Sequence, residues 1–211
     1  MKIGVIIFHK NIRDIYSEAW VDKCLESLKN QTYKDLHFYE INYGGDEYRL
    51  IDNSKFFNIP KKNYADAMNF IISEAFSDGC DFIFNTNLDD YYREDRIEKQ
   101  LHYLNLGYDI VSSDFCYINE SDQFIRNMIM SRFLDIKRNL KFNHNVISHP
   151  SVGMSKNFWL DSRNRYNVDK VPTEDLFLWK ESIDRDYKFY IVNEILLYYR
   201  IHSKQVSKNN I

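Results

Sequence analysis

The 211-residue sequence predicts a three-layer α/β fold, in which helices cover both faces of a central, mostly parallel mixed sheet. Short, continuous apolar runs alternate along the chain with longer amphipathic segments, and this alternation is typical of such sheets. Neither an internal repeat nor a linker rich in Pro, Gly or Ser interrupts the pattern. We therefore expect a single domain over residues 1–211.

The first half of the chain predicts successive pairs of strand and helix. Residues 3–8 form an apolar strand, and residues 17–31 form a helix with one apolar face. A strand over 36–41 precedes Gly44 and Gly45, which indicate a tight turn or, less commonly, a close approach of the backbone to a ligand. A helix over 63–76, which Gly79 ends, leads into a strand over 82–84.

The second half predicts a helix over 93–106, a strand from 109 to 113, a helix over 126–142 and strands over 189–192 and 195–201. The helix over 126–142 has an apolar side and many basic residues. Such a helix usually packs on the core with a solvated face, but it can also lie on an anionic membrane or contact phosphates. The loop over 146–154 carries His149, which matters for function only if the loop faces acidic residues.

Two adjacent carboxylates, Asp89 and Asp90, follow the strand over 82–84. Open α/β sheets bind ligands at the carboxyl ends of their strands, and oxygen ligands suit a hard cation such as Mg²⁺ or Mn²⁺. The pair therefore indicates a metal-assisted site for a phosphorylated ligand. The alternative is that one of the two carboxylates only caps the helix that follows.

A second acidic pair, Glu174 and Asp175, occupies the first turn of an apolar helix, with Thr173 as the expected N-cap. Carboxylates at this position interact favourably with the helix dipole by about 0.3–1 kcal/mol without any function. Catalytic and purely structural interpretations of this pair both stay open at this point.

Composition narrows the class of protein. With 28 basic and 31 acidic residues the net charge is −3, which argues against nucleic acid as the main partner. Cys24, Cys80 and Cys116 show no paired spacing, so neither a disulfide framework nor a zinc site is expected, and we expect a reducing, cytoplasmic compartment. No apolar run is long enough for a signal peptide or a transmembrane segment, so we expect a soluble protein whose contact with membranes, if any, is peripheral.

Taken in order, seven segments of the chain resemble glycosyltransferases of family 2, which have the Rossmann-like GT-A fold. The segments are GVIIFHKN, CLESLKNQTYKDLHFYEINYGGD, NYADAMNFIISEA, CDFIFNTNLDDYY, HPSVGMSKNFW, TEDLFLW and YYRIHSKQVS. The resemblance covers nearly the whole chain and implies a nucleotide-binding half over about 1–115 and an acceptor half over about 116–211. It also implies inverting transfer of a sugar from a nucleotide-sugar donor, with a UDP-sugar favoured, to a hydroxyl of a glycan or another acceptor.

The resemblance further implies Mn²⁺ or Mg²⁺ under the donor diphosphate, held by a DxD-type motif. NLDD matches that motif with Asn87 in place of the usual leading Asp. By this match Asn87 bonds a ribose or phosphate, Asp89 lies nearer the ribose, and Asp90 is the favoured metal ligand, although either carboxylate can serve. His202 and Arg200 match the closing segment of the family, in which the histidine reaches the metal or the diphosphate.

The TED segment matches the motif that supplies the general base, which makes Asp175 the candidate base with Glu174 beside it. His9 and Asn11, together with Asp46, fall where the family holds the nucleotide base. The usual Pro-Thr-Tyr-Asn-like segment is altered there, so the identity of that base is not readable from this sequence.

Two separate acidic motifs suit this chemistry, because a carboxylate that a metal neutralises cannot also accept the proton of the acceptor hydroxyl. Two other classes of protein stay open. A sugar-phosphate nucleotidyltransferase would also use a metal-bound carboxylate, but it is expected to have a glycine-rich basic loop after the first strand, which this sequence lacks. A non-catalytic domain that binds nucleotide sugars or glycans would keep the fold without needing Asp175.

Overall fold

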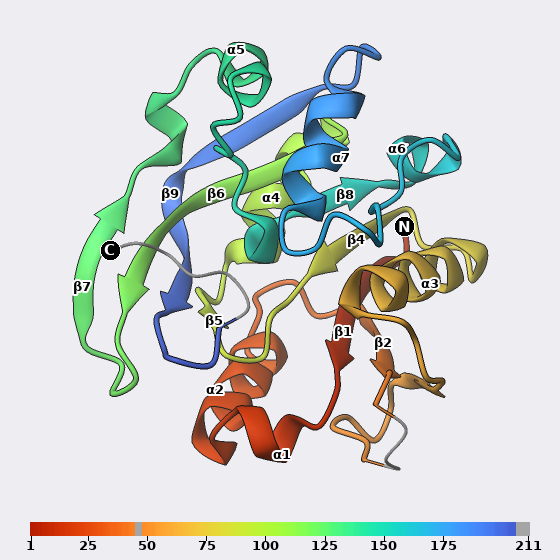
Figure 1. The fold of residues 1–211 in the computed structure, drawn as a ribbon, viewed down its shortest axis with the longest axis vertical. Helices are drawn as coiled ribbons and strands as arrows, with labels where there is room; N and C mark the ends of the chain where they lie inside the picture. Colours follow the sequence, from red (N-terminus) through yellow and green to blue (C-terminus); the bar gives the residue numbers. More distant parts are fainter. Residues whose placement is uncertain (45–47, 206–211) are drawn as a thin grey trace.

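A computed structural model describes residues 1–44 and 48–205. Its strands form one nine-stranded sheet in the order β3-β2-β1-β4-β8-β6-β9-β5, with β7 paired to β6 (Figure 1). The strands are β1 (Ile3–His9), β2 (Leu36–Asn42), β3 (Lys55–Asn58), β4 (Phe82–Asn85), β5 (Tyr91–Tyr92), β6 (Ile110–Ile118), β7 (Phe124–Met128), β8 (Gly153–Ser155) and β9 (Phe189–Arg200).

The sheet is mixed but mostly parallel, as the sequence predicts. Strands β1 to β4 pair in parallel, and β6 pairs in parallel with β9. Strand β8 is antiparallel to both β4 and β6, so β6 and β9 run in the same direction as β1 to β4. Only β5, β7 and β8 run the opposite way among the described strands.

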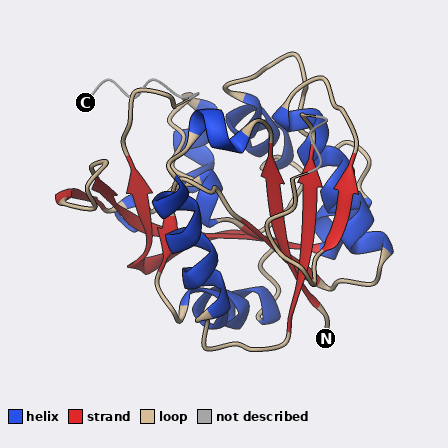
Figure 2. Ribbon diagram, turned by 90° about the horizontal axis from the view of Figure 1, so that it is seen from below, coloured by secondary structure: helices blue, strands red, loops and turns tan. Residues whose placement is uncertain are grey.

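Helices lie on both sides of the strands (Figure 2). They are α1 (Ile12–Ile15), α2 (Glu18–Lys29), α3 (Tyr64–Ser77), α4 (Arg96–Asn105), α5 (Ile136–Lys141), α6 (Lys156–Leu160) and α7 (Glu174–Ser182), with 3₁₀ turns η1 (Met130–Arg132) and η2 (His149–Ser151). Helix α3 packs on β1, β2 and β4, and α4 packs on β6, β8 and β9.

Local sequence explains where the two longest helices begin and end. The Ser17 hydroxyl accepts a hydrogen bond from the Trp20 N–H, and the Asn63 side chain accepts one from the Asp66 N–H, so each helix starts at a capped residue. Gly79 follows α3 with a φ of +91°, a backbone conformation that glycine adopts without strain. The apolar faces of the helices and the continuous apolar strands then form one core.

The structure corrects three expectations about individual elements. The prediction of one helix over 126–142 is wrong, because this stretch contains the end of β7, η1 and the six-residue α5. The strands over 189–192 and 195–201 are one strand, β9, with an irregularity in its pairing to β6 near Val192 and Ile195. The short strands β3, β5 and β8 have too few residues to show a periodicity, and the sequence did not reveal them.

Candidate active site

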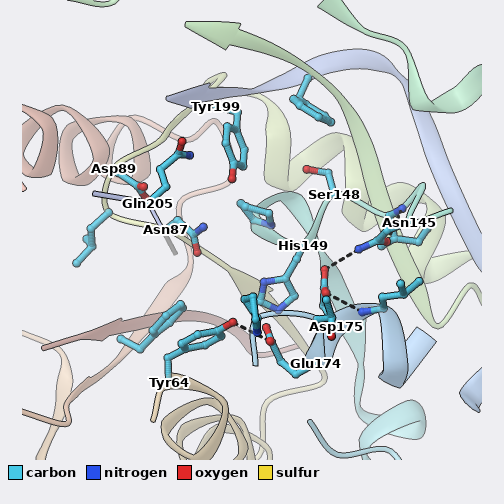
Figure 3. Close-up of a pocket in the computed structure, with 18 of the residues that line it drawn as sticks. Tyr64, Asn87, Asp89, Asn145, Ser148, His149, Glu174, Asp175, Tyr199 and Gln205 are labelled. Atoms are coloured by element: carbon cyan, nitrogen blue, oxygen red, sulfur yellow. Dashed lines mark hydrogen bonds between the residues drawn. The ribbon is translucent and has the colours of Figure 1, made fainter. Parts of the chain in front are cut away.

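A cavity of about 430 Å³ lies at the edge of the sheet where β4 ends, and both halves of the chain line it (Figure 3). Its walls combine aromatic, apolar and acidic side chains. From the first half come Phe8, Tyr16, Tyr43, Tyr64, Asn87, Leu88, Asp89 and Phe115; from the second half come Tyr117, Met128, Met130, Asn145, Ile147, Ser148, His149, Pro150, Pro172, Thr173, Glu174, Asp175, Leu176, Tyr199 and Gln205.

Asn87 and Asp89 reach this cavity from the turn after β4. One carboxylate oxygen of Asp89 lies 2.9 Å from Nε2 of His202. The Asp90 carboxylate, in contrast, is 1% exposed and accepts a hydrogen bond of 2.8 Å from the backbone N–H of Arg200. Burial, and to a smaller degree the charge of Asp89, raise the pKa of Asp90 well above its usual range. Asp89 therefore lines the cavity and Asp90, the predicted metal ligand, does not.

Arg200 is completely buried and does not line the cavity. Its guanidinium donates to the backbone carbonyl of Asp89 at 2.8 Å and to that of Asn119 at 3.0 Å, and it forms an ion pair of 2.6 Å with Asp122. The side chain therefore connects the acidic turn after β4 to the turn between β6 and β7. Its contact with the donor stays a prediction, since these contacts are all within the protein.

His202 is buried beside the rings of Trp20 and Tyr16, whose centroids lie 5.0 and 6.0 Å from its own. The Gln205 side chain accepts from the His202 N–H at 3.2 Å and donates to the Arg200 carbonyl at 2.9 Å. Residues 206 and 207 of the predicted closing segment lie outside the described residues. Up to Gln205, which lines the cavity, that segment packs against the acidic turn.

Two side chains at this end of the cavity have atoms that can coordinate a divalent metal. Asp89 offers a carboxylate and His202 an imidazole nitrogen, and both types of atom bind Mn²⁺. Nδ1 of His202 is buried and accepts or donates no bond within the described chain. No group of three or more His, Cys, Asp or Glu side chains within residues 1–44 and 48–205 is arranged as a metal site. Asp89 and His202 are therefore the candidate ligands at this end of the cavity.

At the opposite side of the cavity, α7 begins with Glu174 and Asp175, and Thr173 at the N-cap makes no side-chain capping bond. The Asp175 carboxylate is half-buried and accepts hydrogen bonds from the Asn145 side chain at 2.8 Å and from the Leu176 N–H at 2.6 Å. The pair thus faces a cavity, which a purely structural interpretation does not require.

Glu174 is 3% exposed and accepts a hydrogen bond of 2.7 Å from the Tyr64 hydroxyl. Burial is the main cause that raises its pKa to about 7, the charge of Asp175 adds to the effect, and the bond from Tyr64 opposes it. At neutral pH a large share of the Glu174 carboxyl groups is therefore protonated.

His149 lines the same cavity as both acidic pairs, which is the condition under which the sequence made it relevant. Its Nε2 lies 3.1 Å from the side-chain nitrogen of Asn85 and 2.9 Å from the Tyr166 hydroxyl. Burial lowers the pKa of His149, although the charge of Asp175 opposes this. The imidazole is therefore neutral at pH 7.

Two of the residues predicted to hold the nucleotide base, His9 and Asn11, do not line the cavity. His9 is buried with its Nε2 3.0 Å from Glu40, and that carboxylate also accepts bonds from residues 50, 51 and 54. Asn11 is exposed, has a φ of 49° and lies against Gly44. Asp46 lies outside the described residues. His9 thus contacts the carboxylate that holds the segment after β2.

Sequence patterns missed several residues that shape the site. Tyr64 lies on α3 and Asn145 in an exposed loop, and each contacts one carboxylate of the second acidic pair. Phe8 at the end of β1 and Tyr199 near the end of β9 line the cavity. Aromatic residues at strand ends could have pointed to these last two. No helix in the described part of the chain is long and apolar enough to cross a membrane.

The family model and the relatives found by comparison with known proteins agree on one family. The family described as Glycosyl transferase family 2 matches residues 5–160. The O-antigen biosynthesis glycosyltransferase WbnJ of Escherichia coli is 27% identical over 205 residues, which cover 91% of this chain and 78% of WbnJ. An uncharacterized glycosyltransferase of Methanocaldococcus jannaschii is also 27% identical, over 89% of this chain and 68% of its own length.

Solved structures show the same fold at low sequence identity. Residues 1–349 of S. aureus TarS in complex with UDP-GlcNAc superpose with a TM-score of 0.74 and 13% identity over 100% of this chain, and the complex of TarS with UDP gives 0.69 and 14% over 95%. The chain spans 62% and 61% of those two TarS chains. At this identity the likeness concerns the fold alone.

Proposed function

The chain belongs to glycosyl transferase family 2, and on that premise we propose that it transfers a sugar from a UDP-sugar to a hydroxyl of a glycan or glycoconjugate, with inversion at the anomeric carbon. The observation that carries the proposal is that two separate acidic motifs, at Asp89 and at Asp175, line opposite sides of one cavity. The complexes of TarS with UDP and UDP-GlcNAc support uridine as the nucleoside of the donor.

The donor diphosphate is expected at the first of these sides, near Asn87, Asp89 and His202. A divalent metal would be held there by Asp89 and His202 and would supply positive charge for the departing phosphate. The Asn87 amide, which lacks a charge, can donate to a phosphate or ribose oxygen without repelling it. Arg200 fixes this turn through the Asp89 carbonyl.

The acceptor is expected at the second side, where Asp175 acts as general base. In the reaction the acceptor oxygen forms a bond to the anomeric carbon while the bond to the diphosphate oxygen breaks, and Asp175 takes the hydroxyl proton. The hydrogen bonds from Asn145 and Leu176 hold the Asp175 carboxylate in one orientation. Glu174, held by Tyr64, lies beside it and is catalytic only through its effect on that carboxylate.

Donor binding tests the first half of this proposal. We expect UDP and UDP-sugars to raise the melting temperature with Mn²⁺ present and to lose most of this effect with a chelator. Calorimetry should show Asp89→Asn to weaken UDP binding by about tenfold or more, since it removes the charged ligand of the metal. The exposed Asp52→Asn is the matched control. Equal affinity with Mn²⁺ and with chelator would contradict the metal requirement.

The products distinguish the three classes of protein left open by the sequence. A glycosyltransferase releases a nucleoside diphosphate from the nucleotide sugar, slowly even with water as acceptor. A nucleotidyltransferase instead consumes a nucleoside triphosphate and releases pyrophosphate. A binding module does neither.

A further inference from the structure

A second surface, which adjoins the cavity, combines exposed apolar and basic side chains. It comprises residues 124–142, which include β7, η1 and α5, and we refer to it as the 124–142 surface. Nine large apolar side chains are strongly exposed in the described part of the chain, and five of them belong to this stretch: Phe124, Ile125, Ile129, Leu134 and Phe142. Leu134 is 92% and Phe142 66% exposed. The other four are scattered along the chain, whereas these five belong to one stretch, and grouped exposed apolar residues are typical of interaction sites.

The same stretch has a positive net charge, whereas the whole chain has a negative one. It contains five basic residues and one acidic residue, although the chain as a whole has a net charge of −3. Arg126, Arg132 and Arg138 are exposed and form no ion pair with any residue that the structure describes. Lys137 and Lys141 both contact Asp184, at 2.8 and 3.0 Å.

Each of the three arginines lies over an aromatic ring, and one of these rings, Phe142, is strongly exposed. Arg132 lies over the ring of Phe133 at 4.9 Å from its centroid, and Arg138 lies over the ring of Phe142 at 6.0 Å. Arg126 lies over Tyr117 at 5.3 Å. Basic heads that alternate with exposed apolar side chains match the boundary between lipid phosphates and acyl chains.

We propose that the 124–142 surface binds the face of an anionic lipid bilayer, with Leu134 and Phe142 entering the apolar layer and the arginines contacting lipid phosphates. Figure 1 shows β7 at the left edge of the molecule and α5 at its top, both away from α3 at the right. A second copy of the chain is a poorer partner, because an isologous contact would bring the same unpaired arginines together. This inference goes beyond the proposed function and does not depend on it.

The position of this surface also concerns the cavity. Met128 at the end of β7 and Met130 in η1 line the cavity, while their neighbours Ile129 and Arg132 are exposed. A bilayer bound to the 124–142 surface would therefore lie beside the cavity.

Sedimentation with lipid vesicles tests the inference on the full chain. The probe is a vesicle of phosphatidylcholine with about one third phosphatidylglycerol, compared with phosphatidylcholine alone. We expect binding to the anionic vesicles only, and loss of that binding as salt rises. Leu134→Glu/Phe142→Glu and, separately, Arg132→Gln/Arg138→Gln should each weaken binding by about tenfold or more.

Controls in the same protein make the result specific. Leu160→Glu changes an apolar side chain that is 71% exposed on α6, and Lys29→Gln/Lys34→Gln removes two exposed basic groups elsewhere; both should bind vesicles as the wild type does. The inference is overturned if the wild type pellets equally with both kinds of vesicle or with neither. It is also overturned if light scattering shows that the wild type is a dimer, that the Leu134→Glu/Phe142→Glu variant is a monomer, and that this variant binds vesicles as the wild type does.

Discussion

The two neighbouring carboxylates at the start of α7 differ in their surroundings. Glu174 is buried beside Tyr64, whereas Asp175 is half-buried at the cavity wall and accepts two N–H bonds. The raised pKa of Glu174, about 7, follows mainly from that burial. Of these two adjacent residues, Glu174 therefore has a carboxyl group whose charged form is disfavoured, and Asp175 has one that a substrate in the cavity can reach.

The first prediction concerns stability and pH. The pKa of Glu174 is raised from 4.5 to about 7, so the stability that its neutral form contributes is fully present below pH 4.5 and is lost as the pH rises through 7. Between pH 5 and 8 we expect the free energy of unfolding to fall by about 1–3 kcal/mol more for the wild type than for Glu174→Gln.

Urea denaturation at a series of pH values measures this difference. Glu181→Gln, at an exposed position on the same helix, is the matched control and should follow the wild type. Parallel curves for the wild type and Glu174→Gln would show that burial at this position does not disfavour the charged form.

At the scale of residues the sequence located the acidic motifs but not the direction of each side chain. Asn87, Asp89, Glu174 and Asp175 line one cavity, as their chemical types suggest. The preference for Asp90 rested on its place in the motif, whereas its carboxylate is bonded in the structure to the backbone N–H of Arg200, 110 positions away in the chain. Orientation at the end of a strand depends on such distant partners, which a local pattern does not contain.

At the scale of elements, long periodic segments were predicted well. Helices α2 and α3 and strands β1 and β2 have several apolar residues each in a regular spacing, and their bounds agree with the structure within a few residues. The stretch 126–142 also has apolar residues in helical spacing, but Ile129 is exposed and β7 pairs with the edge of β6. Tertiary pairing overrides local periodicity there.

The second prediction concerns the connection that Arg200 makes between three elements. This buried side chain joins β9 to the turn after β4 and to the turn between β6 and β7. Arg200→Leu leaves two carbonyls without their donor and removes one of the two cationic partners of Asp122, which keeps Lys23, so we expect a loss of about 2–4 kcal/mol in the free energy of unfolding.

The matched control is Arg163→Leu, which removes an exposed arginine paired with Asp161 and should cost about 1 kcal/mol or less. Chemical denaturation compares the two variants. If Arg200→Leu were no more destabilising than the control, Arg200 would not hold the acidic turn, and a direct contact with the donor would become the better assignment.

At the scale of the whole molecule, the site depends on topology. The parallel strands bring the turn after β4 to the sheet edge, and the chain returns after β8 and β9 to place α7 and Gln205 around the same cavity. The family resemblance predicted that these segments cooperate. The contacts of Tyr64, Asn145 and His149 could not be predicted, because they join segments far apart in the sequence whose meeting only the fold determines.

The central claim is that the donor is held on the side of Asp89 while Asp175 takes the proton of the acceptor on the other side. The most direct test is the turnover of Asp175→Asn. It is measured as release of nucleoside diphosphate from the nucleotide sugar that binds in the melting-temperature experiment. The substitution keeps the shape of the side chain but removes the base, so we expect a rate lower by about 10² to 10⁴. Donor affinity, measured by calorimetry on the same variant, should stay within about twofold, because the interaction lost is made only in the transition state. Turnover within a few-fold of the wild type, or loss of donor binding in proportion to the loss of rate, would contradict the claim.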